Sequence, residues 1–204
     1  MTTYYVNGNL STNGTGTNLN PFNSLQDGAD ALNAGDTLII RPATYRSTIQ
    51  FNAANNGTSS NRTKIIWEAG CVIDGQFVRP TAPPWGDESF KEGALGYAQG
   101  YLVTFRYCKH MEMAGNGLEI KNSLGSGLLC TGNPILSANQ RGLNLLVEDV
   151  YIHHVRWQLG KADECDDVTF NRFRCHNGGE FATFPRSGSV VNWPNAITKK
   201  MAPT

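Results

Sequence analysis

The chain has 204 residues with 17 basic and 17 acidic side chains, so its formal net charge is zero. That balance excludes a strong overall attraction to nucleic acid or to an anionic membrane surface. No apolar run approaches the roughly 20 residues that a membrane-spanning helix needs. The 22 glycines suit a protein made of short strands and tight bends.

The first residues and the cysteines give information about the cellular compartment of the protein. Met1-Thr2-Thr3 leads directly into a predicted strand, without the charged and apolar regions of a signal peptide. A cytoplasmic or phage-borne protein and a secreted protein whose signal has been removed both fit this start. The five cysteines are widely spaced and form no CxxC pair, so we expect buried free thiols rather than a zinc site.

The first predicted elements are a strand at Tyr4-Tyr5-Val6 and a short helix from about Leu25 to Asn33. Ser24 is a candidate N-cap, with Asp27 three residues later in a variant of the capping box. The apolar positions of the helix recur at helical spacing, at Leu25, Ala29 and Leu32. Gly35 is then expected to end the helix.

Further strand segments follow at Leu38-Ile39-Ile40, Thr44 to Phe51, Lys64 to Glu68, and Val72-Ile73. After them comes a long insertion from Gln76 to Gly100, rich in proline and glycine and without strand-like alternation. Its Trp85 is a candidate platform on which a sugar ring stacks.

The order of these segments resembles the N-terminal part of right-handed parallel β-helix proteins of the pectate-lyase-like (pectin lyase fold) superfamily. The matching pieces are Tyr4 to Val6, Pro21 to Gln26, Ala34 to Thr37, Thr44 to Arg46, and Val72 to Gly75. The resemblance implies a single all-β domain, a right-handed parallel β-helix (a solenoid) with a short N-terminal capping α-helix. In that arrangement residues 1–36 form the first strand and the helix, 37–192 form the coils, and 193–204 form a tail. We expect the helix to lie across the open end and cover the first unpaired coil.

A degenerate internal repeat agrees with stacked coils. The repeated hexapeptides are Gly117 to Asn122, Asp149 to His154, and Arg172 to Asn177, at offsets of 32 and 23 residues. Removing the polar insert near 133–142 brings both offsets to a period in the twenties, which is typical of a solenoid. Strand alternation then predicts two buried columns, Leu118/Val150/Phe173 and Ile120/Ile152/Cys175. Asn122, His154 and Asn177 follow at a bend, where stacked Asn amides can bond one another.

The outward positions of the same hexapeptides form two polar columns. One column is Lys121, His153 and His176, and its neighbour is Glu119, Tyr151 and Arg174. Two interpretations remain open: a solvated face with ordinary charges, or a strip that binds an extended acidic glycan.

An acidic cluster follows the second hexapeptide, with Arg156 and Lys161 nearby. It places four carboxylates within five residues: Asp163, Glu164, Asp166 and Asp167. Oxygen-rich sites suit Ca²⁺, which makes calcium a candidate cofactor. The alternative is an exposed acidic turn that needs no metal, since no EF-hand spacing is present.

The resemblance implies a carbohydrate-active protein, and the first hypothesis is a polysaccharide lyase that cleaves an acidic glycan by β-elimination. Such a reaction needs a base near the uronate C5 proton and cations that neutralise the carboxylate. Lyases with this fold commonly use Lys or Arg on the outer face, often with Ca²⁺. The candidate catalytic residues are Lys121, His153 and His176. The candidate substrate contacts are Arg174, Tyr151, Arg156 and Trp85. The alternative is a non-catalytic β-helix: a glycan-binding module, a phage tail-spike-like part or a truncated lyase relative. The sequence leaves the sugar and the oligomeric state open, a homo-oligomer included.

Overall fold

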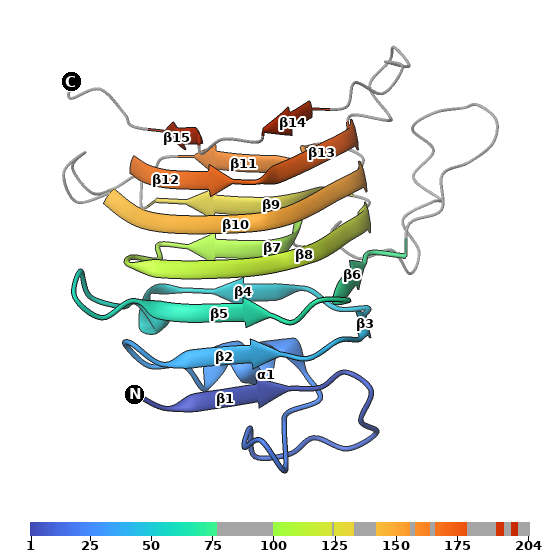
Figure 1. Cartoon of the computed structure of the whole chain (residues 1–204), viewed down its shortest axis with the longest axis vertical. Helices are drawn as coiled ribbons and strands as arrows, with labels where there is room; N and C mark the ends of the chain where they lie inside the picture. Colours follow the sequence, from blue (N-terminus) through green and yellow to red (C-terminus); the bar gives the residue numbers. More distant parts are fainter. Residues whose placement is uncertain are drawn as a thin grey trace.

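The computed structural model describes residues 1–76, 100–123, 125–132, 142–155, 158–163, 166–178, 191–193 and 197–199. The side chains of residues 142, 143, 163, 166, 177, 178, 191–193 and 197–199 lie outside the described part. In the described ranges the chain is mostly β-strand, with one α-helix (Figure 1). No helix in these ranges is both long and apolar enough to cross a membrane.

The elements are, in chain order, β1 (Thr3–Val6), α1 (Leu25–Asp30), β2 (Thr37–Ile40), β3 (Thr44–Tyr45), β4 (Ile49–Phe51), the 3₁₀ turn η1 (Ala53–Asn55), β5 (Thr63–Trp67), β6 (Val72–Asp74), β7 (Tyr101–Arg106), β8 (Met111–Ser123), β9 (Ser126–Thr131), β10 (Gly142–Val155), β11 (Gly160–Asp163), β12 (Asp166–Asn171), β13 (Phe173–Gly178), β14 (Val191–Trp193) and β15 (Ile197–Lys199).

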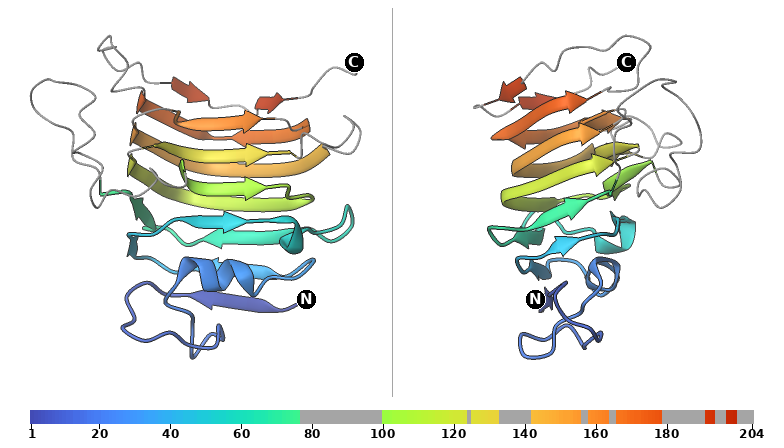
Figure 2. Two further views of the ribbon diagram at one scale, coloured as in Figure 1. Left: turned by 180° about the vertical axis from the view of Figure 1, so that it is seen from behind. Right: turned by 90° about the vertical axis from the view of Figure 1, so that its right-hand side faces the viewer.

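The described strands form two sheets. The larger has the order β1-β2-β5-β8-β10-β12-β15, with β3, β6, β13 and β14 paired alongside, and the smaller has the order β11-β9-β7-β4. Strand neighbours come from successive passes of the chain, which stack one above another along the long axis of the molecule (Figures 1 and 2). Apart from β12–β15 and β13–β14, the described pairs are parallel. The predicted all-β class is therefore confirmed, and its sheets are parallel.

Strands β8 and β10 are long because each continues through a bend. The bend in β8 is at Asn116 (φ 48°) and Gly117 (φ 83°), and the bend in β10 is at Asp149 (φ 54°). Glycine, asparagine and aspartate adopt this left-handed backbone at the lowest cost. Arg172 (φ 49°) takes the same conformation between β12 and β13. Each of these passes therefore presents two outward faces, one before the bend and one after it.

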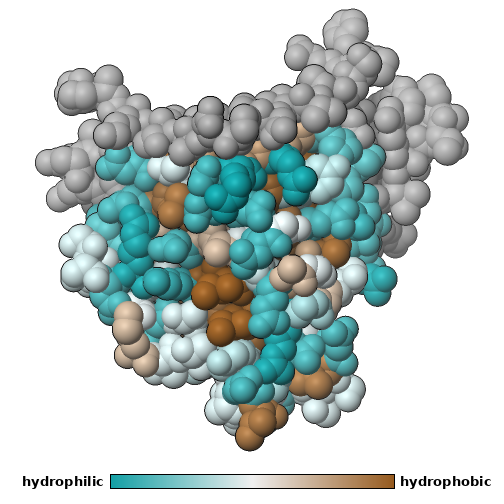
Figure 3. All heavy atoms as spheres, viewed as in Figure 1, coloured by the Kyte–Doolittle hydropathy of each residue, from teal (hydrophilic) through white to brown (hydrophobic). Residues whose placement is uncertain are grey.

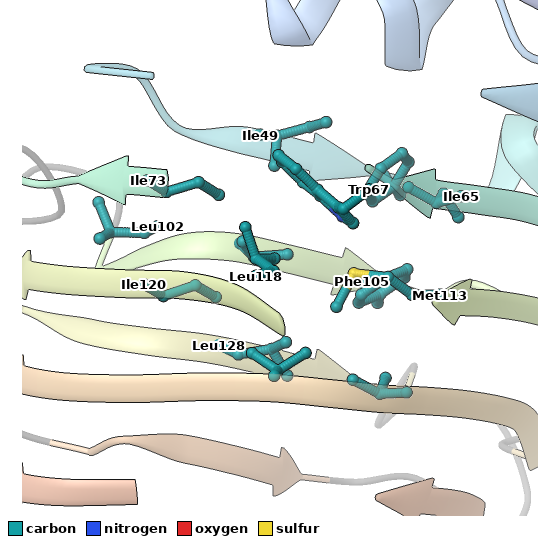
Figure 4. Packing of buried hydrophobic residues seen from close by; sticks show 14 of the residues in the cluster. Ile49, Ile65, Trp67, Ile73, Leu102, Phe105, Met113, Leu118, Ile120 and Leu128 are labelled. Carbon is teal, nitrogen blue, oxygen red and sulfur yellow. The ribbon is translucent and has the colours of Figure 1, made fainter. Parts of the chain in front are cut away.

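The predicted register after the bend is confirmed. Ile120 pairs with Ile152, and Ile152 pairs with Cys175. These three residues are at most 3% exposed. The column Leu118, Val150 and Phe173 is equally buried. Apolar side chains of both sheets converge in the space between them, where Figure 4 shows Ile73, Leu118, Ile120 and Leu128.

Two predicted elements need correction. The expected strand from Thr44 to Phe51 is two strands, because β3 pairs in the larger sheet and β4 in the smaller one. The helix begins as predicted, since the Ser24 hydroxyl accepts from the Asp27 N–H at 3.3 Å. It ends earlier, at Asp30, because the Leu32 N–H bonds back over only three residues.

The position of α1 also differs from the expected one. The helix packs against β1 and β2 and lies along the free edge of β4 (Figure 2). The carboxamide of Gln26 accepts from the Gln50 N–H at 2.9 Å and donates to the Gln50 carbonyl at 3.0 Å, as a neighbouring strand would. Asn55, 2% exposed, donates to the carbonyls of Ala29 and Leu32 near the helix end. The helix therefore covers the edge of the smaller sheet.

The edge of β1 is covered by residues 14–22 instead. The Tyr5 N–H donates to the Gly16 carbonyl at 2.8 Å, and the Phe22 N–H donates to the Tyr5 carbonyl at 2.9 Å. This segment satisfies backbone groups that an open strand edge would offer to another chain. Helix and sheet approach closely at Gly28, where an added Cβ would lie 2.5 Å from a methyl group of Val6.

Candidate functional site

The two predicted polar columns lie side by side on the face that follows the bends. Register places Lys121 opposite His153, and His153 opposite His176. In the neighbouring column Glu119 lies opposite Tyr151, and Tyr151 opposite Arg174. With His154 at the end of this stretch, these residues make contact with one another. We call them the His–Tyr cluster: Glu119, Lys121, Tyr151, His153, His154, Arg174 and His176.

His153 is the most enclosed member of the cluster. It is only 9% exposed, although it occupies an outward position of its strand. Its Nε2 lies 2.7 Å from Glu119 Oε1, and its Nδ1 bonds His154 Nδ1. The prediction that His153 is exposed is therefore wrong, because neighbouring rings cover the imidazole and both of its nitrogens are engaged. Its role as a base stays a prediction.

Lys121 is held by the same carboxylate as His153. Its Nζ lies 3.3 Å from both oxygens of Glu119, and about a quarter of each side chain is exposed. The lysine charge is thus balanced within the cluster. Asp74 continues the Lys121 column in β6, where it accepts from the side chain of Asn122 at 3.0 Å. Asn122 therefore bonds a carboxylate rather than the stacked Asn amide that the repeat predicts.

Tyr151 and His176 form the second half of the cluster. The Tyr151 hydroxyl shares a hydrogen bond with His176 Nε2. The imidazoles of His153 and His176 stack at 5.0 Å with an interplanar angle of 9°, and the Tyr151 ring lies 4.7 Å from that of His153. The Arg174 guanidinium lies over the Tyr151 ring, 5.3 Å from its centre. Phenol, imidazole and guanidinium groups thus meet at one exposed surface.

The electrostatics favour an ionised Glu119 beside a neutral His153. Burial alone would raise the pKa of Glu119, but hydrogen bonds from His153 and Lys121 lower it below its usual value. Burial lowers the pKa of His153, helped by the nearby His154 and His176, while the bond to Glu119 opposes the shift. A neutral His153 donates through Nε2 to the carboxylate and accepts at Nδ1 from His154.

The sequence pattern missed the part that His154 plays. It placed this residue at a bend, and the backbone there is indeed left-handed, with φ 51°. That conformation interrupts strand alternation, so the ring of His154 lies beside those of His153 and His176, with centres 4.7 and 5.5 Å away. The His-His pair at 153–154, next to a predicted bend, was the available signal.

Of the other predicted site residues, only Asp167 has a side chain in the described part of the chain. Asp167 is exposed in β12, with φ 52°. Asp163 and Asp166 lie in β11 and β12, but their side chains are outside the described part. Arg156, Glu164 and Trp85 lie outside the described residues altogether, as does the side chain of Asn177. Among the residues that the structure describes, no three His, Cys, Asp or Glu side chains are grouped to hold a metal ion.

The face before the bends has a different character. Figure 3 shows apolar residues there among hydrophilic ones. One outward column runs through Tyr5, Ile39, Ile66 and Ala114 and ends in polar residues at Glu148 and Asn171. Glu148 accepts from Asn171 at 2.7 Å and lies 4.0 Å from an Arg172 nitrogen. This column has the phenol of Tyr5 but, among its described residues, no imidazole beside it, so this face is the weaker candidate for acid–base chemistry.

Comparison with known proteins leaves the chain without an assigned family. No protein-family model matches it, and a search of curated proteins finds no significant relative. The function therefore has to be argued from the geometry of the His–Tyr cluster.

Proposed function

We propose that this chain is a right-handed parallel β-helix that binds an acidic polysaccharide on the His–Tyr cluster and cleaves it by β-elimination. Support for the fold comes from parallel strands that stack pass upon pass and from left-handed bends that recur at equivalent positions. The N-terminal resemblance to pectate-lyase-like proteins agrees with it. Because one fold carries many functions, the activity is argued from the site alone.

The observation that carries the proposal is the meeting of acid–base groups and cations on one outer face. β-Elimination from a uronate needs a group that removes the C5 proton and positive charge beside the carboxylate. The cluster supplies imidazole and phenol groups for the first need and Lys121 and Arg174 for the second. The columns run along the stacking direction, so an extended chain of sugars can contact several passes at once.

A non-catalytic glycan-binding β-helix is the second candidate, and one observation favours it. Both ring nitrogens of His153 and the carboxylate of Glu119 are satisfied inside the cluster. A polar network whose bonds are internally complete also serves to rigidify a surface. Under this reading the cluster recognises a glycan without changing it.

The test is a panel of uronate polymers and neutral polysaccharides, assayed for binding and for unsaturated uronate ends, with and without EDTA. We expect one acidic polymer to bind, to give the unsaturated product, and to bind more weakly at high salt because exposed charges are screened over about 8–10 Å. Loss of product on EDTA treatment would extend the proposal to Ca²⁺, as the acidic segment at 163–167 suggests.

Variants test whether glycan binding depends on the His–Tyr cluster or on another part of the surface. The triple replacement of Lys121, His153 and His176 by alanine should abolish binding, whereas Glu148→Gln, on the other outward face, should leave it unchanged. Binding without product would favour the second candidate. Equal binding by wild type and the triple variant would contradict both readings of the cluster.

A further inference from the structure

Two of the three candidate catalytic residues, Lys121 and His153, already have partners within the cluster. The ammonium group of Lys121 is paired with Glu119, with 3.3 Å from Nζ to each oxygen. His153 is 9% exposed and has no nitrogen left for a substrate. A residue that exchanges a proton with a bound sugar needs both access to the surface and a partner that can hold the proton.

Tyr151 meets these two conditions. Its side chain is half-buried, and its hydroxyl is bonded to His176 Nε2 at the outer face of β10 and β13. The ring lies 4.7 Å from the imidazole of His153, and the guanidinium of Arg174 lies 5.3 Å from its centre. The phenol is therefore fixed in orientation and linked to a proton acceptor.

Arg174 meets the requirement for a carboxylate-binding group. It is exposed, and in the described part of the chain no carboxylate lies within ion-pair distance of it. A planar guanidinium binds a carboxylate through two parallel hydrogen bonds. A uronate carboxylate on Arg174 would lie beside the ring whose hydroxyl is bonded to His176.

We infer that Tyr151 is the catalytic residue that exchanges the proton, that His176 positions and polarises it, and that Arg174 binds the uronate carboxylate. This inference rests on the proposed function and deepens it. It moves the proton transfer from Lys121 and His153 to Tyr151, which lies in the adjacent column.

The elimination balances on this pair alone. The phenol proton passes to Nε2 of His176, and the resulting phenolate removes the proton from C5 of the uronate. The C5–H electron pair forms the C4–C5 double bond, and the C4–O bond breaks with its electrons on the leaving oxygen. Tyr151 then returns the proton to that oxygen, which leaves the pair ready for another turnover. The carboxylate charge that grows as C5 loses its proton is stabilised by Arg174.

The experiment compares Tyr151→Phe with Tyr101→Phe, a matched change on the smaller sheet, where the Tyr101 hydroxyl lies 3.2 Å from Gln158. On the polymer found with the panel, Tyr151→Phe should lower kcat about 100-fold or more while the Kd for a non-cleaved oligouronate stays within about threefold. Tyr101→Phe should match wild type in both.

Three further variants address the partners of Tyr151. His176→Gln should lower kcat and change the shape of its pH profile, which a purely structural role would not do. Arg174→Gln should weaken oligouronate binding about tenfold, and Arg174→Lys should restore it only in part, because a lysine lacks the planar pair of donors.

The outcomes distinguish an error in the proposed function from an error in the assignment of Tyr151. If wild type neither binds nor cleaves any acidic polymer, the proposed function is wrong and the assignment falls with it. If wild type binds without cleaving, the assignment of a catalytic Tyr151 is overturned while glycan binding stands. If wild type cleaves and Tyr151→Phe cleaves equally fast, only the assignment is overturned.

Discussion

At the scale of the residue, a charged side chain in the buried columns would destabilise the fold. Ile152 lies between Ile120 and Cys175 and has no exposed surface. Replacing Ile152 with aspartate should lower the free energy of unfolding by about 3–5 kcal/mol, because the carboxylate would be buried without a partner. Ile152→Val is the control and should cost only about 0.5–1.5 kcal/mol. Urea unfolding measures both, and an aspartate variant as stable as the valine variant would refute the register.

The His–Tyr cluster predicts how stability depends on pH. The pKa of Glu119 is lowered by folding, so its contribution is present above the unfolded pKa and is lost as the pH falls through the folded value. The pKa of His153 is also lowered, so folding again disfavours the protonated form and stability falls as the pH drops below about 6.5. Both shifts therefore act in the same direction.

The urea concentration at the unfolding midpoint should accordingly decrease when the pH is lowered from 7.5 to 5. His153→Gln should make that decrease smaller. Glutamine keeps a donor for Glu119 but does not titrate. Ile152→Val serves as the matched control, since it destabilises the fold without removing a titratable group and should keep the wild-type dependence. An unchanged pH dependence in His153→Gln would show that this imidazole does not contribute.

At the scale of the element, α1 completes the smaller sheet through one side chain. Gln26 makes two hydrogen bonds to the backbone of Gln50, at the edge of β4. Gln26→Ala should lower the free energy of unfolding by about 1–3 kcal/mol, because it leaves those backbone groups without their partner. Asp30→Ala removes only the bond between Gln26 and Asp30 and should cost about 0.2–0.5 kcal/mol.

Urea unfolding measures the two costs, and hydrogen exchange at the Gln50 amide reports the edge directly. Exchange there should accelerate in Gln26→Ala and remain near the wild-type rate in Asp30→Ala. Equal rates in both variants would mean that the helix protects β4 by packing alone. The sequence predicted the helix and its cap from local spacing, but the partner of Gln26 lies 24 residues away and left no local pattern.

At the scale of the whole molecule, the core carries thiols on successive passes of the chain. Cys71, Cys108, Cys130 and Cys175 are buried. Burial raises the pKa of Cys71 to about 11 and that of Cys175 to about 12. Because the thiolate is the reactive form, these groups should react slowly with an aromatic disulfide reagent in the native state.

The Cys165→Ser variant removes the one cysteine outside the described residues. In that variant we expect no fast thiol in native buffer and four in urea, as counted by the colour released from the reagent. Wild type provides the comparison for Cys165. A fast-reacting thiol in the native variant would contradict the burial of the columns.

The sequence by itself determined the strand alternation, the register of the hexapeptides and the helix cap. These features depend on neighbours along the chain: a period of two residues, a Ser24–Asp27 spacing, and like residues at like positions in each repeat. Tertiary structure decided the rest. It enclosed His153, drew His154 into the cluster, divided Thr44–Phe51 between two sheets and placed α1 on β4. Each of these outcomes depends on which side chains other passes of the chain bring within a few ångströms. Contacts such as His153 with Glu119, 34 residues apart, are formed in space and leave no trace in local spacing.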